Sequence, residues 1–274
     1  MIIKTSETVK CRKLSRGRFA PAEASVIIEK ELPVNVNGTH LFTASIAPGM
    51  EKEFVAGYLF GQGFINSVSD ITDLDIDDDG AKVMLKNGKK ASPAAVKASF
   101  RIVSGGGKTA YFDASRLPQI NSPVKVNKKD IFRAMNTLFE KAALYGETEG
   151  VHAAGLFTPE ASPICIVEDI GRHNTLDKII GHALLNRIDC DKVFAVSTGR
   201  MASEMVTKIC RAGISLVATK TAVTDKGLEI GKKCGLTIIG FVRDAGNKIN
   251  TDMELRVINK AEMKIYCGAE RVIW

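Results

Sequence analysis

Three apolar segments in the second half of the chain each stop at hydroxyl-bearing and cationic residues. These endings are Ser197-Thr198-Gly199-Arg200, Thr219-Lys220-Thr221 and Phe241-Val242-Arg243-Asp244-Ala245-Gly246. Two of them run into predicted helices, whose N-terminal N–H groups and dipole favour an anion. Ligands of open α/β sheets bind outside the carboxyl ends of parallel strands. The pattern predicts a site for a phosphate-bearing ligand along one sheet edge; the alternative is that these polar residues only cap strands and solvate loops.

A second polar segment, Glu168-Asp169-Ile170-Gly171-Arg172-His173-Asn174, also lies between an apolar strand and a helix. Its carboxylates and His173, with the distant His152, are residue types that bind metal ions. Asp169 or Asn174 could instead cap the helix, and we favour this structural role because the metal-ligand pattern is weak. The zinc-deaminase motif and the G-x-S-x-G elbow of hydrolases are both absent from the sequence. We therefore expect no protein-bound metal.

The glycine-rich stretch Ser104-Gly105-Gly106-Gly107-Lys108-Thr109 has the composition of a phosphate-binding loop. A P-loop requires glycine where Ile102 stands. A dinucleotide fingerprint requires a crossover helix, for which Pro118 and Pro123 leave no room. We interpret the stretch as a backbone-permissive loop between two halves of the protein.

The overall composition is that of a globular protein with a sizeable core. Of its 274 residues 45% are apolar, yet there is no uninterrupted apolar run of transmembrane length. The first residues lack the long apolar segment of a secretory signal, so we expect none. We expect a cytoplasmic protein without membrane contact. The net charge of +7 favours an anionic partner, but the low aromatic content of 6% and the lack of an RNA-binding motif argue against nucleic acid. The six scattered cysteines are interpreted as reduced thiols.

Hydrophobic periodicity divides the chain into an arm, an α+β part and an α/β core. The arm covers residues 1–24, the α+β part residues 25–122, the core residues 123–248 and a C-terminal extension residues 249–274. The α+β part is predicted to hold a helix within 50–64 and two hairpins, with turns at Asn37-Gly38 and Asp79-Gly80. The core is predicted to hold helices at 129–144, 173–188, 200–212 and 224–234, and strands at 152–157, 164–168, 192–197, 215–220 and 236–242. The alternation predicts at least three parallel strands covered by helices on both faces.

Several separated motifs occur in the order in which they occur in the FdhD/NarQ family of formate dehydrogenase accessory proteins. They are ELPVNVNG, EFVAGYLFGQGFI, GVHAAGLF, EDIGRHNTLDKIIGHAL and STGRMASEMVTKICRAGISLVATKTAVTDKGLEIGKKCGLTIIGFVR. The sequence closely resembles this family over roughly residues 25–245. The resemblance implies a cytidine-deaminase-like three-layer α/β/α core without the deaminase zinc, and a homodimer.

The same resemblance implies a function in sulfur delivery. Members of the family accept sulfur from a cysteine desulfurase as a persulfide on a loop cysteine. They pass it to the molybdenum bis(molybdopterin guanine dinucleotide) cofactor of formate dehydrogenase, and the guanine nucleotide binds near the last core strand. In this sequence that segment corresponds to Phe241, Val242, Arg243, Asp244, Ala245 and Gly246. To it we add Ser197, Arg200, Lys220 and His173 as candidate binding residues.

One departure from the family pattern concerns the sulfur-carrying residue. Gly106 stands where the family has the loop cysteine, and the chain has no cysteine between Cys11 and Cys165. Sulfur transfer through a persulfide needs an accessible thiolate, which glycine cannot supply. We therefore expect weak or absent transfer, with Cys11 as the first substitute to examine. The alternative is a non-catalytic module that binds the cofactor without handling sulfur.

Overall fold

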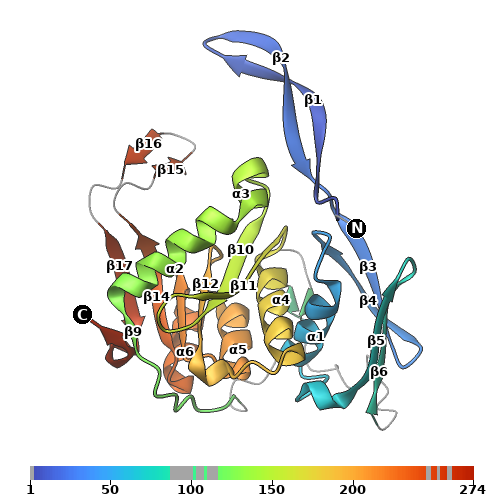
Figure 1. Ribbon diagram of the computed structural model, residues 1–274, viewed down its shortest axis with the longest axis vertical. Coiled ribbons are helices and arrows are strands. Elements are labelled where there is room, and N and C mark those ends of the chain that lie inside the picture. Colours follow the sequence, from blue (N-terminus) through green and yellow to red (C-terminus); the bar gives the residue numbers. More distant parts are fainter. Residues whose placement is uncertain are drawn as a thin grey trace.

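The computed structural model describes residues 3–86, 101–102, 108–109, 117–244, 248–251, 254–257 and 261–274 (Figure 1). The chain starts with a long two-stranded antiparallel ribbon of β1 (Ser6–Ser15) and β2 (Arg18–Ile27), which projects from the body of the protein. Its tip is Arg16-Gly17, with φ of 50° and 75°, the left-handed pair of a type I′ hairpin turn. The predicted basic arm is thus one strand and part of the next of a hairpin. The strand predicted to begin at Ser25 extends back to Arg18 and pairs with β1, where Ser25 lies opposite Thr8.

A small mixed sheet follows the ribbon. It has the order β4-β3-β6-β5, from β3 (Lys30–Val36), β4 (Thr39–Ile46), β5 (Ile71–Asp77) and β6 (Gly80–Leu85). Both predicted hairpins are present, and Asn37-Gly38 has φ of 49° and 77°. The turn of the second hairpin is Asp78-Asp79, one residue earlier than predicted, because Gly80 pairs with Asp77 as the first residue of β6. Helix α1 (Glu51–Gly61) connects the two hairpins, as predicted, and is followed by a short 3-10 turn (Val68–Asp70). The strands β7 (Arg101–Ile102) and β8 (Lys108–Thr109) pair with each other farther along the chain.

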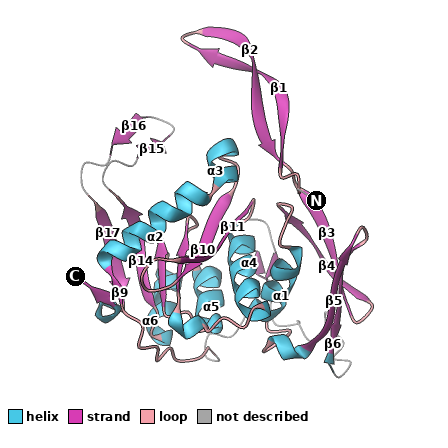
Figure 2. Ribbon diagram, in the orientation of Figure 1, coloured by secondary structure: helices cyan, strands magenta, loops and turns pink. Residues whose placement is uncertain are grey.

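The core of the protein is a six-stranded sheet with the order β11-β10-β12-β13-β14-β17 (Figure 2). Its strands are β10 (His152–Phe157), β11 (Pro163–Asp169), β12 (Phe194–Ser197), β13 (Leu216–Thr219), β14 (Thr237–Arg243) and β17 (Glu262–Cys267). β12, β13 and β14 run parallel, and the other neighbours pair antiparallel. The prediction of three parallel strands is therefore confirmed, and β17 adds an edge strand from the predicted C-terminal extension.

Helices cover both faces of this sheet. One face carries α2 (Lys128–Lys141), whose Ile131, Met135 and Leu138 pack on alternate strand residues such as Phe194 and Val196. The other face carries α4 (Arg172–Leu185), α5 (Ser203–Ala212) and α6 (Asp225–Cys234), packed in one cluster with α1 and the small sheet. The remaining elements are α3 (Ala143–Thr148), β9 (Val126–Asn127), β15 (Lys248–Thr251), β16 (Glu254–Val257), β18 (Val272–Ile273) and 3-10 turns at Cys190–Lys192 and Ala269–Arg271. The predicted mixed α/β class is confirmed, whereas the likeness to cytidine deaminases stays a prediction.

Helices α1 and α4 contact each other at their backbones through two glycines. A Cβ placed on Gly57 would lie 1.8 Å from the carbonyl oxygen of Asp177, and one on Gly181 would lie 1.7 Å from that of Glu53. No side chain fits between the two helices at this crossing. The glycines therefore join the small sheet and its helix to the core.

Within the described residues, no helix is long and apolar enough to cross a bilayer.

Candidate functional site

The carboxyl ends of the three parallel strands meet at one edge of the central sheet. The backbone N–H of Lys220 donates to the carbonyl of Ser197 over 3.1 Å, and the N–H of Phe241 donates to the carbonyl of Thr221 over 3.0 Å. The three polar strand ends found in the sequence are thus neighbours in space, as parallel pairing requires. Their side chains, however, do not all face outward.

Ser197 and Val242 are buried beneath the surface of this edge and support its backbone. The Ser197 hydroxyl accepts a hydrogen bond from the Gly199 N–H at 3.0 Å, and the Thr219 hydroxyl donates to the Gly199 carbonyl at 2.7 Å. These bonds fix the turn that leads to Arg200, which is exposed. Val242 is 1% exposed and packs in the core under α2. Neither residue presents a side chain to a ligand.

A pocket of about 210 Å³ lies where α4, α5 and α6 begin. It is lined by Arg172, His173, Ala202, Ser203, Glu204, Thr224, Asp225 and Lys226. Gly171 and Ala202, the N-caps of α4 and α5, carry no side-chain acceptor for the first-turn N–H groups. Three helix N-termini and the Arg172 and Lys226 side chains make this pocket favourable for an anion, since helix dipoles and cations act in the same direction. Glu204 and Asp225 offset part of that charge.

Burial and the positive charges at this edge lower the pKa of two neighbouring side chains, His152 and Arg172. Burial lowers the pKa of the half-buried His152 below its usual 6.5, and the nearby charges of Arg172, His173 and Arg200 lower it further. Burial and the Arg200 charge likewise lower the pKa of Arg172. His173 lies 3.2 Å from the Glu204 carboxylate, measured from Nε2. The structure thus brings His173, Arg200, Arg172 and His152 close enough together for their charges to interact.

Lys220 is held among aromatic rings on the α2 side of the edge. Its ammonium lies 4.7 Å from the ring centre of Phe139 and 5.5 Å from that of Tyr145, and it donates to the Tyr145 hydroxyl at 3.3 Å. The π-faces of the two rings attract the cation and restrain its position. Lys220 is therefore a fixed, half-buried positive charge rather than a freely moving surface lysine.

Phe241 forms the far end of the site and has an unusual backbone. Its φ of 53° lies in the left-handed region, inside an irregularity of the β14–β17 pairing. Such a conformation is uncommon for a bulky residue and is retained where the surroundings enforce it. Lys264 lies 4.7 Å and Arg243 5.3 Å from its ring centre. The half-buried Phe241 is thus an aromatic platform beside two cations.

The rest of the predicted segment 241–246 is paired within the protein. Arg243 also contacts Glu262 at 3.2 Å, and Asp244 accepts a hydrogen bond from the Asn136 amide at 2.7 Å. The Asn136 contact ties the end of β14 to α2. Ala245, Gly246 and Gly106 lie outside the described residues, so the roles predicted for these three positions stay predictions.

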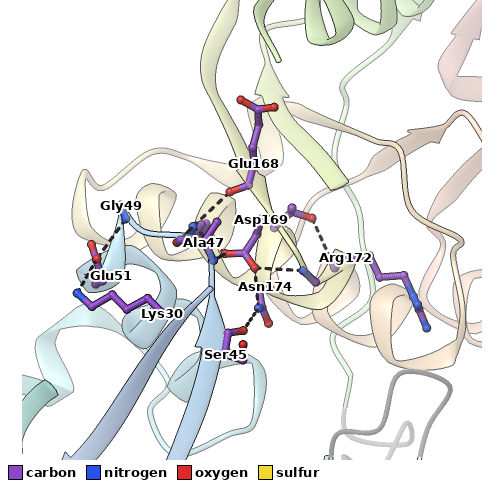
Figure 3. Close-up of polar contacts among 12 residues, drawn as sticks. Lys30, Ser45, Ala47, Gly49, Glu51, Glu168, Asp169, Arg172 and Asn174 are labelled. Carbon is purple, nitrogen blue, oxygen red and sulfur yellow. Dashed lines mark hydrogen bonds and ion pairs between the residues drawn. The ribbon is translucent and has the colours of Figure 1, made fainter. Parts of the chain in front are cut away.

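The carboxylates considered as metal ligands have structural partners (Figure 3). Asp169 is fully buried and forms a 2.7 Å ion pair with the buried Lys178. It also accepts hydrogen bonds from the Ala47 N–H, the Gly171 N–H and the Asn174 amide at 3.2, 3.1 and 2.7 Å. Asp169 therefore joins the small sheet to the beginning of α4, where it fixes the turn that carries Arg172. The structural role favoured from the sequence agrees with these contacts, but the suggested cap is wrong: the N-cap of α4 is Gly171, and no side chain caps the helix.

Glu168 points to the other face of the sheet, at the start of α3. Its carboxylate accepts hydrogen bonds from the N–H groups of Leu144 and Tyr145 at 3.2 and 2.6 Å. Burial raises its pKa, although these two hydrogen bonds act in the opposite direction. Glu168 thereby supports Tyr145, the residue that contacts Lys220. Within the described parts of the chain no group of three or more histidine, cysteine and carboxylate side chains is arranged to hold a metal ion.

The cysteines of the body of the protein are buried or half-buried, and only Cys11 on β1 is exposed. Burial raises the pKa of Cys165 and of Cys190 to about 11. Cys210 and Cys234 contact each other, and the pKa of Cys210 is raised by this hydrogen bond and by burial. A thiol with a raised pKa is a poor nucleophile at neutral pH because little thiolate is present.

Several residues of the site were not selected from the sequence. Lys226 stands two residues after Thr224 at the start of α6, a position that the anion argument could have selected. Phe139 and Tyr145 lie on α2 and α3, far along the chain from Lys220, and Lys264 reaches Phe241 only because β17 pairs with β14. No local pattern marks these three, since strand pairing and helix packing alone bring them to the site.

Comparison with known proteins agrees with this architecture. The family model described as "FdhD/NarQ family" matches residues 27–273. A "Sulfur carrier protein FdhD" of Geobacillus kaustophilus is 31% identical over 251 residues, which is 90% of this chain and 95% of that protein. The protein of the same name from Sulfolobus acidocaldarius is 32% identical over 244 residues, 88% of this chain and 94% of that one.

A solved structure shares the fold. It is the crystal structure of a protein described as a formate dehydrogenase accessory protein, from Desulfotalea psychrophila. The superposition has a TM-score of 0.76 at 22% identity and covers 98% of this chain and all of the other. The long family match and the two relatives above 30% identity lead to one conclusion: the chain belongs to the FdhD/NarQ family.

Proposed function

We propose that this chain serves the maturation of formate dehydrogenase by binding the guanine-nucleotide end of the molybdenum bis(molybdopterin guanine dinucleotide) cofactor. The observation that supports it is the edge formed by β12, β13 and β14, where helix N-termini and cationic side chains surround a pocket of about 210 Å³. The names of its relatives, sulfur carrier proteins FdhD, point to the same process. The cofactor is cargo here, passed on to the client enzyme.

The residues at this edge suit the chemistry of a guanine dinucleotide. Its phosphates are anions, which favours the pocket at the N-termini of α4, α5 and α6, with Arg172 and Arg200 nearby. A guanine ring is flat and aromatic, which favours stacking on Phe241 between its two cations. Lys220, held by its aromatic neighbours, adds a fixed charge at the same edge of the sheet, on the α2 side. In this proposal the chain binds and orients the nucleotide, and its own groups transfer no proton to it.

Sulfur transfer is the second part of the family's function, and we propose that it is weak in this chain. A persulfide passes its outer sulfur when an acceptor thiolate attacks that sulfur: the donor's S–S bond breaks, the donor leaves as a thiolate, and the acceptor becomes the persulfide. Gly106 replaces the expected acceptor cysteine. The raised pKa of Cys165, Cys190 and Cys210 argues against substitution by these thiols. The exposed Cys11 is the remaining accessible thiol among the described residues.

Calorimetric titration with GDP, a soluble probe for the guanine-nucleotide end, tests the binding proposal. We expect saturable binding that weakens at least about tenfold in Arg200→Ala and in Lys220→Ala, since a charge-assisted hydrogen bond contributes about 1.5–3 kcal/mol. Lys125→Ala is the matched control, because Lys125 is an exposed lysine outside this edge. Absence of GDP binding, or equal weakening in the control, would contradict the proposal.

Mass spectrometry after incubation with a cysteine desulfurase and cysteine tests the sulfur step. We expect no gain of a sulfur atom on the protein, with GDP binding retained. That outcome supports the second candidate function, a binding module without sulfur chemistry, which the absence of cysteine from position 106 favours. A gained sulfur that maps to a named cysteine, and that disappears in Cys11→Ser, would show instead that the carrier function has moved to the ribbon.

A further inference from the structure

The outer half of the β1–β2 ribbon is a positively charged element that lies outside the site described above. Residues 11–21, here called the outer ribbon, carry four cations and no carboxylate. The cations are Arg12, Lys13, Arg16 and Arg18. The two carboxylates of the ribbon, Glu7 and Glu23, lie nearer its base, where Glu23 is opposite Lys10. The negative charge of the ribbon is therefore confined to its base, and the outer ribbon is uniformly positive.

Leu14 and Phe19 form an exposed apolar pair on the outer ribbon. They lie opposite each other across the two strands and are 57% and 65% exposed. Arg12 shares their face, and its guanidinium carbon lies 5.8 Å from the Phe19 ring centre. The other three cations lie on the opposite face or in the turn, since neighbouring residues of a strand point to alternate sides. Cations therefore surround the apolar pair on both faces of the ribbon and at its tip.

The ribbon is fixed at its base and stands clear of the body of the protein (Figure 1). The Ile28 N–H donates to the Thr5 carbonyl at 2.9 Å. The Ser6 hydroxyl donates to the Glu147 carboxylate on α3 at 3.0 Å. Every residue from 10 to 21 is exposed. The outer ribbon can therefore reach a large, flat partner without a collision between that partner and the body.

The combination of cations and apolar residues favours an anionic lipid bilayer as this partner. A nucleic-acid groove would match the cations, but its phosphates and base edges make little use of Leu14 and Phe19. An acidic protein surface would contact one face and leave the cations of the other unused. Lipid headgroups surround an inserted tip on every side, and the hydrocarbon beneath them receives apolar side chains. Leu14 and Phe19 each stand two residues from the turn, which is about 7 Å along a strand and within the roughly 5–10 Å that interfacial segments penetrate.

We propose that the outer ribbon attaches this chain to the surface of anionic bilayers, with its cations among the headgroups and Leu14 and Phe19 inserted beneath them. Such an attachment needs no spanning segment, so it replaces the expectation of no membrane contact, which rested on the lack of one. The aspartate-rich strand β5, which an anionic surface repels, lies toward the other end of the molecule (Figure 1). Because the attraction acts on exposed charges, it weakens as salt rises. The attachment does not depend on nucleotide binding at the sheet edge.

Co-sedimentation of the full-length chain with lipid vesicles tests the attachment. We expect binding to vesicles of equal parts phosphatidylcholine and phosphatidylglycerol to be at least about tenfold tighter than binding to phosphatidylcholine alone, and to weaken as NaCl is added. Arg12→Gln/Arg16→Gln removes two cations and should weaken this binding at least about tenfold. The matched control, Lys125→Gln/Lys129→Gln, makes the same change in charge on exposed residues elsewhere and should bind like wild type. Equal binding to both lipids, or an equal loss in the control, would overturn the proposal.

Leu14→Thr/Phe19→Thr separates insertion from charge attraction alone. This variant keeps the net charge and the strand propensity of the ribbon, and we expect about tenfold weaker vesicle binding because the apolar pair is lost. The substituted side chains are exposed, so folding is retained, as circular dichroism of each variant will verify. Vesicle binding that is unchanged in this variant would contradict the insertion of the pair.

Tryptophan fluorescence reports the insertion directly. Trp274 is the single tryptophan, so Phe19→Trp/Trp274→Phe places the only indole on the outer ribbon. We expect its emission to move to shorter wavelength on anionic vesicles and to be quenched by lipids brominated in their acyl chains. An emission that stays unchanged on bound vesicles would overturn the proposal. Binding to a DNA duplex that is lost in Arg12→Gln/Arg16→Gln but kept in Leu14→Thr/Phe19→Thr, without vesicle binding, would assign the ribbon to nucleic acid instead.

Discussion

Substitution of Gly57 by alanine tests the close contact between α1 and α4. The added Cβ would lie 1.8 Å from the Asp177 carbonyl oxygen, 2.7 Å from its carbon and 2.8 Å from the Gly181 nitrogen. All three are backbone atoms, so no side chain can rotate away and the helices must separate. Overpacking of this kind costs about 3 kcal/mol, and the better helix propensity of alanine returns about 1 kcal/mol.

The expected net loss for Gly57→Ala is therefore about 2 kcal/mol, which lowers Tm by roughly 4–8 °C in a protein of this size. Urea unfolding followed by circular dichroism measures the free energy directly. Gly146→Ala is the matched control, since Gly146 is also helical and a Cβ there meets nothing within 4 Å. We expect the control to be neutral or slightly stabilising. A Gly57→Ala protein within about 0.5 kcal/mol of wild type would refute the contact.

Two further predictions concern buried charges. The buried Lys208 lies 2.6 Å from the Asp177 carboxylate, so Asp177→Ala leaves its charge unpaired and should lower the free energy of unfolding by about 3–5 kcal/mol. The double variant Asp177→Leu/Lys208→Met should recover much of that stability in urea unfolding. Equal losses in the two proteins would contradict the ion-pair argument. For His152, burial holds the folded pKa below the usual 6.5, so the unfolded chain binds the proton more readily. The free energy of unfolding should therefore decrease as the pH drops through about 6.5, and this decrease should be smaller in His152→Gln. An unchanged pH dependence in that variant would show that other titrating groups cause it.

The strand-end residues show what sequence reasoning could predict about the site. Ser197, Lys220 and Phe241 follow apolar runs, and parallel strands place their carboxyl ends at one edge, so residues over 40 positions apart were expected to be neighbours. The same rule could not say that Ser197 points inward. Which side chains of a turn face solvent depends on its local hydrogen bonds. Here the Gly199 N–H donates to the Ser197 hydroxyl, and the Thr219 hydroxyl donates to the Gly199 carbonyl.

The sequence by itself determined the order and type of the elements in the core. Strands that are apolar on both faces alternate with amphipathic helices, and this period does not depend on distant contacts. Asn37-Gly38 likewise specified a hairpin, because both residues tolerate the left-handed backbone. The family resemblance came from these same local motifs.

Only the tertiary structure decided which charges are buried and which partners they have. Lys178 and Lys208 are lysines in predicted helices, a residue type that usually faces solvent, yet each is buried and forms an ion pair with an aspartate. Lys264 reaches Phe241 through pairing of β17 with β14, and Phe139 reaches Lys220 through packing of α2 on the sheet. Periodicity specifies which face of an element is apolar, but the contacts between elements distant in the chain depend on how those faces pack together.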